Sequence, residues 1–178
     1  MKILLSEKEL QKTIENLAQT IFRAHSPFSE VILVGIQTRG VVLAERLKKQ
    51  ILQLKKDKKE IPLGVLDINL YRDDLSKHRI PIVKKTEIPV SIEGKGIILV
   101  DEVLYTGRTI RAALDALSDL GRPSFIQLAV LIDRGGRELP IQPDYVGKVH
   151  PIKSNEKISV MFRETDSDEK VTVVHGAF

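Results

Sequence analysis

Short runs of Ile, Leu and Val alternate along the chain with segments whose apolar residues recur at helical spacing. Aromatic residues make up only 4% and Trp is absent, so the core would be built mainly from aliphatic side chains, as in buried parallel strands. Strands that alternate with helices usually form a mostly parallel sheet with helices on both faces. We therefore expect an α/β fold, and the length of 178 residues fits one domain spanning residues 1–178.

Helical spacing and β-branched runs locate the individual elements. A capping box of Ser6 and Glu9 marks the start of the first helix. Helices are predicted at Ser6–Ala24, Gly40–Gln53 and Ile110–Leu120. Strands are predicted at Val31–Val34, Leu63–Leu70, Ile97–Val100, Phe125–Ile132, Tyr145–His150, Ile158–Phe162 and Val171–Val174. The polar stretch Tyr71–Thr86 shows no period and is predicted to be a long loop, which in a compact domain is usually functional.

The composition excludes several kinds of site. Without Cys, the chain has no disulfide, no thiolate zinc site and no thiol nucleophile. Met1–Leu5 is too short for a signal peptide, and no stretch approaches the roughly 20 apolar residues of a membrane helix, so we expect no membrane association and a cytoplasmic location. The net charge of +4 attracts polyanions, but much of the excess lies in a lysine-rich run at residues 48–59, which we interpret as a solvated patch.

The most informative segment is Val100–Thr109, where an apolar strand ends in two acids, followed by a short loop with Thr and Gly and then a helix. In open α/β sheets, ligands bind beyond the carboxyl ends of the strands. The start of a helix offers free N–H groups and the positive end of a dipole, which suit a phosphate. Thr106 and Thr109 add hydroxyl donors, and Gly107 lets the backbone approach the anion. The segment therefore indicates a phosphate site.

The two acids, Asp101 and Glu102, need a different partner because carboxylates repel phosphate. Carboxylates accept hydrogen bonds from vicinal hydroxyls, such as those of a ribose, and can hold Mg²⁺ directly or through water. Acids beside a phosphate site thus indicate a sugar phosphate with free hydroxyls. The Walker pattern is absent, which argues against a P-loop nucleotidase. A plain strand–turn–helix junction capped by Asp101 is the competing interpretation, but it leaves the second acid and the Thr-Gly-x-Thr order unexplained.

At this point the sequence resembles a known family. Val100–Thr109 is similar to the phosphoribosyl-pyrophosphate signature of type I phosphoribosyltransferases, and the chain resembles, more narrowly, the pyrimidine-operon regulatory proteins that double as uracil phosphoribosyltransferases. Three further segments carry the match, in the family's order: Val34–Gly40, Asp67–Ser76 and Asp133–Pro140. The resemblance implies the type I phosphoribosyltransferase fold with a small hood region, and an oligomer that is a homodimer or a homotetramer.

The resemblance also implies a role for the residues of these segments. Asp101 and Glu102 would hold the ribose hydroxyls and act with Arg72 as catalytic residues, while Mg²⁺ would be bound near them through 5-phosphoribosyl pyrophosphate, without a direct protein ligand. The pyrophosphate would be bound by Thr38, Arg39 and Gly40. The remaining contacts to phosphoribosyl pyrophosphate would come from Val103, Leu104, Tyr105, Thr106, Gly107, Arg108 and Thr109.

The loop that begins at Tyr71–Ser76 would close over the reaction, because water would otherwise hydrolyse an oxocarbenium-like sugar. Arg72, Lys77 and Arg79 are candidates to neutralise the leaving pyrophosphate, although each fits a solvated loop cation equally well.

The turn after the strand Phe125–Ile132 would form part of the uracil pocket through Arg134, Gly135 and Arg137, with an ordinary tight turn as the alternative. The implied reaction joins uracil and 5-phosphoribosyl pyrophosphate to give UMP and pyrophosphate, with catalysis from positioning and electrostatics. No general base is identified, because three of the histidines lie outside the strongest motifs: His78, His150 and His175.

Two features depart from the family pattern. The family usually has two adjacent aspartates where this chain has Asp101 and Glu102, and the extra methylene moves the second carboxylate by about 1 Å, which can lower activity. Residues that family members present to attenuator RNA are also changed, since Gly136 stands where a His is usual and the polar face of the first helix shows Glu15, Asn16 and Gln19. The overall positive charge leaves RNA binding open, but we predict that it is weak or absent.

The sequence leaves three functions open. The first is an active uracil phosphoribosyltransferase that could also regulate pyrimidine genes in response to uridine nucleotides. The second is a UMP- or UTP-sensing, RNA-binding transcription attenuator with little catalysis, and the third is a phosphoribosyltransferase for a purine base. A catalytic assay separates the first two, and competition between bases separates the third.

Overall fold

The computed structural model describes residues 2–57, 59–73, 85–151, 153 and 155–175. Its centre is a parallel sheet in which five strands follow the order β3-β2-β4-β5-β6. All four neighbouring pairs are parallel, as the alternation of strands and helices predicts. The bounds of the strands are Val31–Ile36 (β2), Leu63–Leu66 (β3), Gly96–Leu104 (β4), Phe125–Asp133 (β5) and Tyr145–Val149 (β6).

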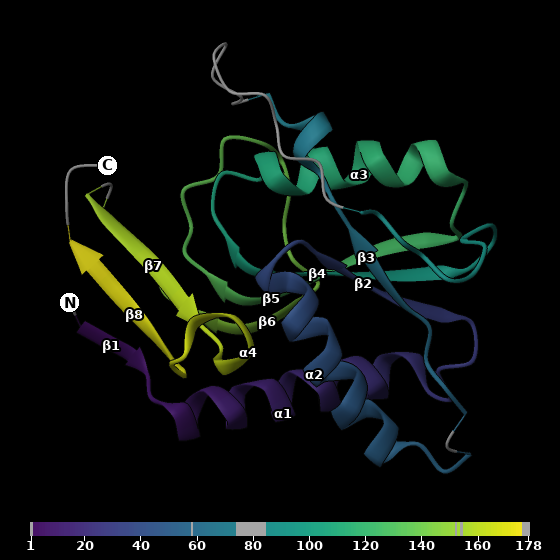
Figure 1. The fold of residues 1–178 in the computed structure, drawn as a ribbon, viewed down its shortest axis with the longest axis horizontal. Helices are drawn as coiled ribbons and strands as arrows, with labels where there is room; N and C mark the ends of the chain where they lie inside the picture. Colours follow the sequence, from purple (N-terminus) through teal and green to yellow (C-terminus); the bar gives the residue numbers. More distant parts are fainter. Residues whose placement is uncertain (1, 58, 74–84, 152, 154, 176–178) are drawn as a thin grey trace.

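Helices cover both faces of this sheet (Figure 1). One face is covered by α1 (Glu7–His25) and α2 (Arg39–Leu54), and the other by α3 (Arg108–Leu120). Side chains of a strand alternate between the two faces, so each face has its own apolar core. On β4, Ile98 belongs to the core beneath α1 and α2, whereas Leu99 belongs to the core beneath α3. The predicted α/β architecture with helices on both sides is confirmed.

A small antiparallel sheet lies beside the main sheet and forms the expected hood (Figure 1). Its order is β1-β8-β7, and a short helix lies between β7 and β8 in the chain. The bounds are Lys2–Leu5 (β1), Glu156–Met161 (β7), Arg163–Asp166 (α4) and Lys170–His175 (β8). Phe162, which is fully buried, belongs to the core beneath α1 and α2, so it anchors the hood to the rest of the molecule.

The helix starts and strand ends show where the predicted bounds were right and where they were wrong. The capping box is confirmed, because the Glu9 carboxylate accepts a hydrogen bond of 2.8 Å from the Ser6 amide. Strand β3 ends at Leu66 and not at Leu70, since its partner β2 ends at Ile36, directly opposite. Strand β1 was not predicted at all, because four residues show little pattern and their partner, β8, lies at the other end of the chain.

Two further differences concern the central strands β2 and β4. Strand β2, which the sequence predicts to end at Val34, continues to Ile36 and therefore includes Gly35. Strand β4, which the sequence predicts to end at Val100, continues to Leu104 and therefore includes both acids. Within the described ranges, none of the helices has the length and apolar content needed to cross a bilayer.

Candidate active site

The strand order of the sheet changes direction between β2 and β4. The chain leaves β2 and builds β3 on one side, whereas β5 and β6 follow β4 outward on the other side. The loops after two such neighbouring strands diverge, and the crevice between them is where ligands bind in open α/β sheets. Here the two loops are residues 37–38, which lead into α2, and residues 105–107, which lead into α3. Each loop is part of one of the predicted site segments.

The acid pair lies on β4 at the edge of this crevice. The last residue pair between β2 and β4 joins Gly35 to Val100, so β4 beyond that point is held by β5 alone. Residues as far as Leu104 stay in the strand because they pair with β5, which extends to Asp133. The neighbouring strand thus corrects the predicted end of β4. It also leaves the two acids in a fixed, extended backbone on the side where β2 has ended.

Asp101 is buried, with 6% of its surface exposed, and Glu102 is half-buried. The Asp101 carboxylate accepts a hydrogen bond of 2.8 Å from the Glu102 amide. Burial raises the pKa of Asp101 well above its usual value, and the neighbouring charge of Glu102 raises it further. The positive charge of Arg72 acts in the opposite direction and is the weakest of the causes. The carboxylate therefore lacks the solvation that it would have at the surface, and a cation or hydroxyl donors would supply it.

A cavity of about 300 Å³ opens beside Asp101. It is lined by Arg72, by Asp101 and by the whole run Val103–Ile110, and so includes the predicted phosphate loop. Gly107, with a φ of 93°, is the N-cap of α3, and this left-handed conformation favours glycine. The first turn of α3 therefore begins at the cavity, where its amides are available to an anion. Thr106 supports the turn by accepting a hydrogen bond from the Arg108 amide (3.3 Å).

The start of α2 lies against β4 beside the acids. A Cβ atom on Gly40 would lie 2.6 Å from the Val100 carbonyl oxygen and 3.3 Å from Asp101 Cα, so only glycine allows this approach. Thr38 is exposed, and the peptide bond that precedes it is cis. The guanidinium of Arg39 donates hydrogen bonds to both carboxylate oxygens of Asp166 on α4, from Nε at 3.0 Å and from Nη2. Asp166 belongs to no recognisable motif, so the sequence alone does not indicate its role.

The predicted base-side turn is built against the phosphate loop. The guanidinium of Arg134 stacks 3.7 Å from the centre of the Tyr105 ring, and the Arg134 amide donates to the Leu104 carbonyl at 3.1 Å. Arg134 is 9% exposed, and its buried Nε finds no hydrogen-bond partner among the described residues. Gly136 has a φ of 78°, and a Cβ atom there would lie 2.5 Å from the Tyr105 ring. This position therefore favours glycine, where the family resemblance leads one to expect a histidine.

Arg137 connects the same two loops. It donates from Nε to the Ile141 carbonyl (2.9 Å), from Nη1 to the Tyr105 carbonyl (2.9 Å) and from Nη2 to the Asp133 carboxylate (2.6 Å). Gly135, next to the stacked Arg134, donates its amide to the other Asp133 oxygen at 2.9 Å. Arg137 thus holds the turn in shape, and Arg134 is the arginine of the turn whose side chain retains a buried donor without an acceptor in the described part of the chain.

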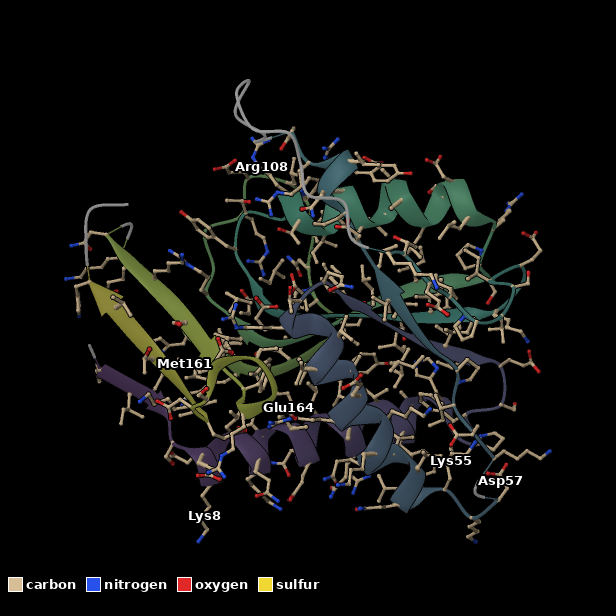
Figure 2. All side chains as sticks on the ribbon, in the orientation of Figure 1. Lys8, Lys55, Asp57, Arg108, Met161 and Glu164 are labelled. Carbon is tan, nitrogen blue, oxygen red and sulfur yellow. The ribbon has the colours of Figure 1, made fainter. Side chains whose placement is uncertain are left out.

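The long loop meets the site at its first residues. Arg108, at the start of α3 (Figure 2), forms ion pairs of 2.7 Å with Asp73 and with Glu138. Arg111 donates a hydrogen bond of 3.1 Å to the Tyr71 carbonyl. These contacts join the beginning of the loop to α3, beside the cavity that Arg72 lines. Lys77 and Arg79 lie outside the described residues.

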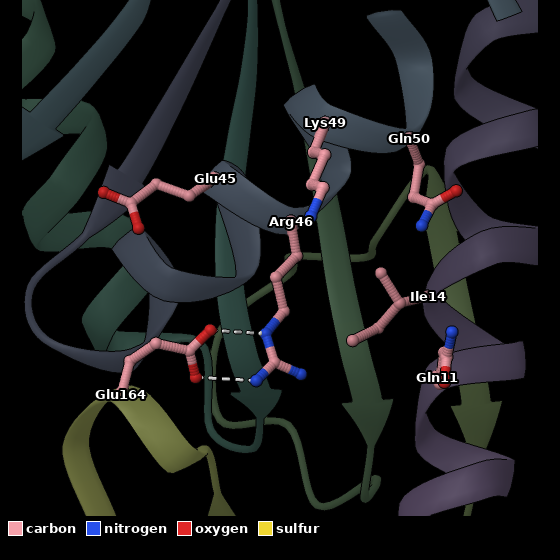
Figure 3. Close-up of a pocket in the computed structure, with 7 residues that line it drawn as sticks. All are labelled: Gln11, Ile14, Glu45, Arg46, Lys49, Gln50 and Glu164. Carbon is pink, nitrogen blue, oxygen red and sulfur yellow. Dashed lines mark hydrogen bonds and ion pairs between the residues drawn. The ribbon is translucent and has the colours of Figure 1, made fainter. Parts of the chain in front are cut away.

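A larger cavity, of about 430 Å³, lies elsewhere, between α1, α2 and α4 (Figure 3). Its lining residues are Gln11, Ile14, Glu45, Arg46, Lys49, Gln50 and Glu164. Arg46 is engaged there, because it donates to Glu164 at 2.9 and 2.6 Å (Figure 3). This lining includes none of the predicted site residues that the structure describes, and it lacks the combination of buried acid, helix start and unused donor found beside β4.

Comparison with known proteins identifies the family of the chain. The family model for the phosphoribosyl transferase domain matches residues 2–164. The bifunctional protein PyrR of Bacillus mycoides is 51% identical over 174 residues, with 96% of each chain covered. That of Pelotomaculum thermopropionicum is 49% identical over 176 residues, which cover 98% of this chain and 96% of the relative.

Solved structures show the same fold at low sequence identity. The hypoxanthine phosphoribosyltransferase of Trypanosoma cruzi superposes with a TM-score of 0.74 at 18% identity, covering 99% of this chain and 98% of its own. A hypoxanthine-guanine phosphoribosyltransferase of Bacillus anthracis gives a TM-score of 0.70 at 19% identity, with the same coverage. The fold, the matched domain and the near-complete relatives lead to one conclusion: the chain belongs to the phosphoribosyl transferase domain family and, within it, to the bifunctional PyrR proteins.

Proposed function

We propose that this phosphoribosyltransferase transfers the 5-phosphoribosyl group to uracil, giving UMP and pyrophosphate. The observation that carries the proposal is the position of the buried Asp101, which shares one crevice with the starts of α2 and α3. A ligand with hydroxyls in its middle and phosphates at two ends matches this arrangement. 5-Phosphoribosyl pyrophosphate is such a ligand.

Each part of the ligand has a partner of suitable chemistry. The ribose hydroxyls donate to Asp101 and Glu102, and the burial that raises the pKa of Asp101 makes such donors favourable. The 5′-phosphate accepts from the amides of the first turn of α3 and from Thr106 and Thr109. The pyrophosphate lies at the start of α2, near Thr38, Arg39 and Gly40, and Arg72 supplies a further positive charge at the cavity.

The residues of the site fit a magnesium ion only if the bound ligand supplies most of its oxygen ligands. Among the described residues, no three His, Asp or Glu side chains gather into a metal site, so Asp101 and Glu102 could supply only part of a coordination shell. Oxygen donors are what Mg²⁺ prefers, and the ribose and pyrophosphate would provide the remainder. When bound there, the ion would neutralise charge on the departing pyrophosphate.

The base pocket is assigned to the turn at Asp133–Pro140. Its main support is Arg134, whose buried Nε lacks an acceptor among the described residues and could donate to a carbonyl oxygen of uracil. The stacking of Arg134 on Tyr105 fixes the guanidinium, and Arg137 holds the two loops together. The choice of a pyrimidine over a purine is supported by the resemblance of this turn to that of uracil phosphoribosyltransferases.

The test is a product assay. The purified chain is incubated with uracil, 5-phosphoribosyl pyrophosphate and Mg²⁺, and nucleotides are separated by chromatography, with hypoxanthine and guanine offered in parallel reactions and in competition. We expect UMP to form and the purines to neither react nor compete. Formation of IMP or GMP in place of UMP would assign the site to a purine base. Absence of any nucleotide product, whichever base is offered, would contradict the proposal.

A regulatory role is a second candidate, favoured by the word bifunctional in the names of the relatives. UMP, as the product, and UTP would occupy the same site and could control it. The face of α1 that includes Lys12 offers little to RNA, because Glu15 lies 3.4 Å from the Lys12 ammonium and neutralises it. We therefore propose nucleotide sensing with weak or absent RNA binding, and the oligomeric state, homodimer or homotetramer, is open to analytical ultracentrifugation.

A further inference from the structure

Arg39, at the start of α2, is joined to the hood by a carboxylate 127 positions away in the chain. Its Nε and Nη2 atoms both donate to Asp166, one to each oxygen of the carboxylate. A planar guanidinium that meets a carboxylate through two parallel hydrogen bonds is held in one orientation, which a single contact would not achieve.

Asp166 is itself rigidly held. Its Oδ2 atom accepts hydrogen bonds from the Phe162 amide (3.1 Å) and from the Thr165 hydroxyl (2.6 Å). Phe162 is fully buried in the core, so the short helix α4 is anchored at the residue that precedes it. The hydrogen bond from Arg39 is the main reason why the pKa of Asp166 falls to about 2, which keeps the carboxylate ionised at physiological pH.

Arg39 keeps one donor group that the contact with Asp166 does not use. Among the described residues, Nη1 makes no hydrogen bond, so its two hydrogens remain available. The negative charge of Glu102 is one of the causes that raise the pKa of Arg39, after the hydrogen bond to Asp166, so the guanidinium lies within electrostatic reach of the acid pair. Gly40, the next residue, contacts the backbone of β4 beside Asp101. Arg39 therefore lies between the hood and the crevice, and only its Nε and Nη2 atoms are used in the contact with Asp166.

We propose that Asp166 is a positioning residue for the phosphoribosyl transfer: it holds Arg39 so that the free edge of the guanidinium meets the pyrophosphate of the incoming ligand. The inference rests on the proposed function, because it requires that Arg39 bind pyrophosphate. An arginine that is already oriented loses less conformational freedom when the ligand arrives, and immobilising one long side chain typically changes affinity by about two- to tenfold. The hood would thus contribute to catalysis without touching the substrate.

The decisive variant is Asp166→Asn, in which an amide replaces one carboxylate oxygen and can no longer accept both hydrogen bonds. We expect the KM for 5-phosphoribosyl pyrophosphate to rise about three- to tenfold, with kcat changed less than about twofold and the KM for uracil unchanged. The matched control is Glu164→Gln on the same helix, because Glu164 pairs with Arg46 and not with Arg39. This variant should lose similar stability in thermal unfolding but keep the KM of the parent protein.

A double-mutant cycle separates positioning from mere structural support. In an Arg39→Ala background, Asp166→Asn should leave the KM for 5-phosphoribosyl pyrophosphate unchanged, since there is no guanidinium left to hold. If Asp166→Asn does not fold, Thr165→Val tests the same point, because it removes one hydrogen bond from Asp166 and should raise KM by a smaller factor. An unchanged or lowered KM in the folded variants overturns the inference, and a lowered KM would show that Asp166 competes with the ligand.

The role of Asp166 can also be tested if the protein does not form UMP. Calorimetric titration of 5-phosphoribosyl pyrophosphate with Mg²⁺ into the parent protein, Asp166→Asn and Glu164→Gln gives the same comparison without turnover. A parent protein that binds the ligand but forms no UMP contradicts the proposed function alone, and the order of the three dissociation constants still decides the role of Asp166. A parent protein that does not bind the ligand overturns both.

Discussion

Replacing Asp101 by Asn should make the protein more stable at neutral pH while it weakens the binding of its ligand. Asp101 is buried, and its carboxylate accepts a hydrogen bond from the Glu102 amide, which an Asn oxygen can accept equally well. What the variant removes is a buried negative charge that sits next to a second carboxylate. Buried charged groups with too few partners typically destabilise by about 1–3 kcal/mol. We take the lower part of this range, because the positive charge of Arg72 offsets some of the penalty.

The expected gain is therefore about 1–2 kcal/mol in the free energy of unfolding at pH 7. For a chain of 178 residues, each kcal/mol shifts Tm by about 2–4 °C, so Tm should rise by about 2–8 °C. Thermal unfolding followed by circular dichroism or calorimetry measures this shift.

The gain should depend on pH in a defined direction. Burial, and then the charge of Glu102, raise the pKa of Asp101 well above its usual value of 3.8. Between about pH 4 and the raised pKa, the folded parent protein holds a proton that the unfolded chain has already lost. Its stability therefore falls as the pH rises through this range, and above it the buried carboxylate is charged. Asn does not titrate, so the advantage of the variant should be small near pH 4 and should grow as the pH rises. A variant less stable than the parent at pH 7, or an advantage independent of pH, would contradict this prediction.

Three further predictions concern the same crevice and the surface of the protein. Glu102→Asp should raise kcat in the UMP assay, because it withdraws the second carboxylate by about 1 Å to the position usual in the family; an unchanged kcat means that Glu is tolerated there. Gly40→Ala should destabilise by about 1–3 kcal/mol in chemical unfolding and weaken ligand binding, since its Cβ atom would lie 2.6 Å from the Val100 carbonyl oxygen; full retention of both would contradict the close contact. In gel-shift titrations, a pyrimidine-operon leader RNA should bind no more tightly than an unrelated RNA of equal length, and tight, salt-sensitive binding of the leader alone would contradict the interpretation of α1.

The fold is predictable from local patterns where those patterns are strong. The periodic apolar residues of α1, α2 and α3 and the β-branched runs of β2, β4 and β5 are sufficient to predict a parallel sheet with helices on both faces. The extension of β4 to Leu104 was not predictable, because it results from pairing with β5 and not from the residues of β4. Pairing of β1 with β8 joins the two ends of the chain, which a short strand does not reveal.

The site shows the same division. The acids and the phosphate loop form one contiguous motif, so a sequence predicts them together, and the rule for strand ends predicts that residues 38–40 lie beside them. Asp166 and Phe162 escape such reasoning, because their contacts with α2 depend on how the hood folds back onto the core. Likewise, the turn residues Arg134 and Arg137 are alike in sequence, and only the structure separates the stacked arginine from the one engaged in three hydrogen bonds.

We propose that the crevice between β2 and β4 binds 5-phosphoribosyl pyrophosphate through the buried Asp101. The most direct measurement is a calorimetric titration of this ligand with Mg²⁺ into the parent protein and into Asp101→Asn, with and without uracil. We predict saturable binding by the parent protein and an affinity at least about tenfold weaker in the variant, the loss expected for one charged hydrogen-bond acceptor. Equal affinity in the two proteins would contradict the claim.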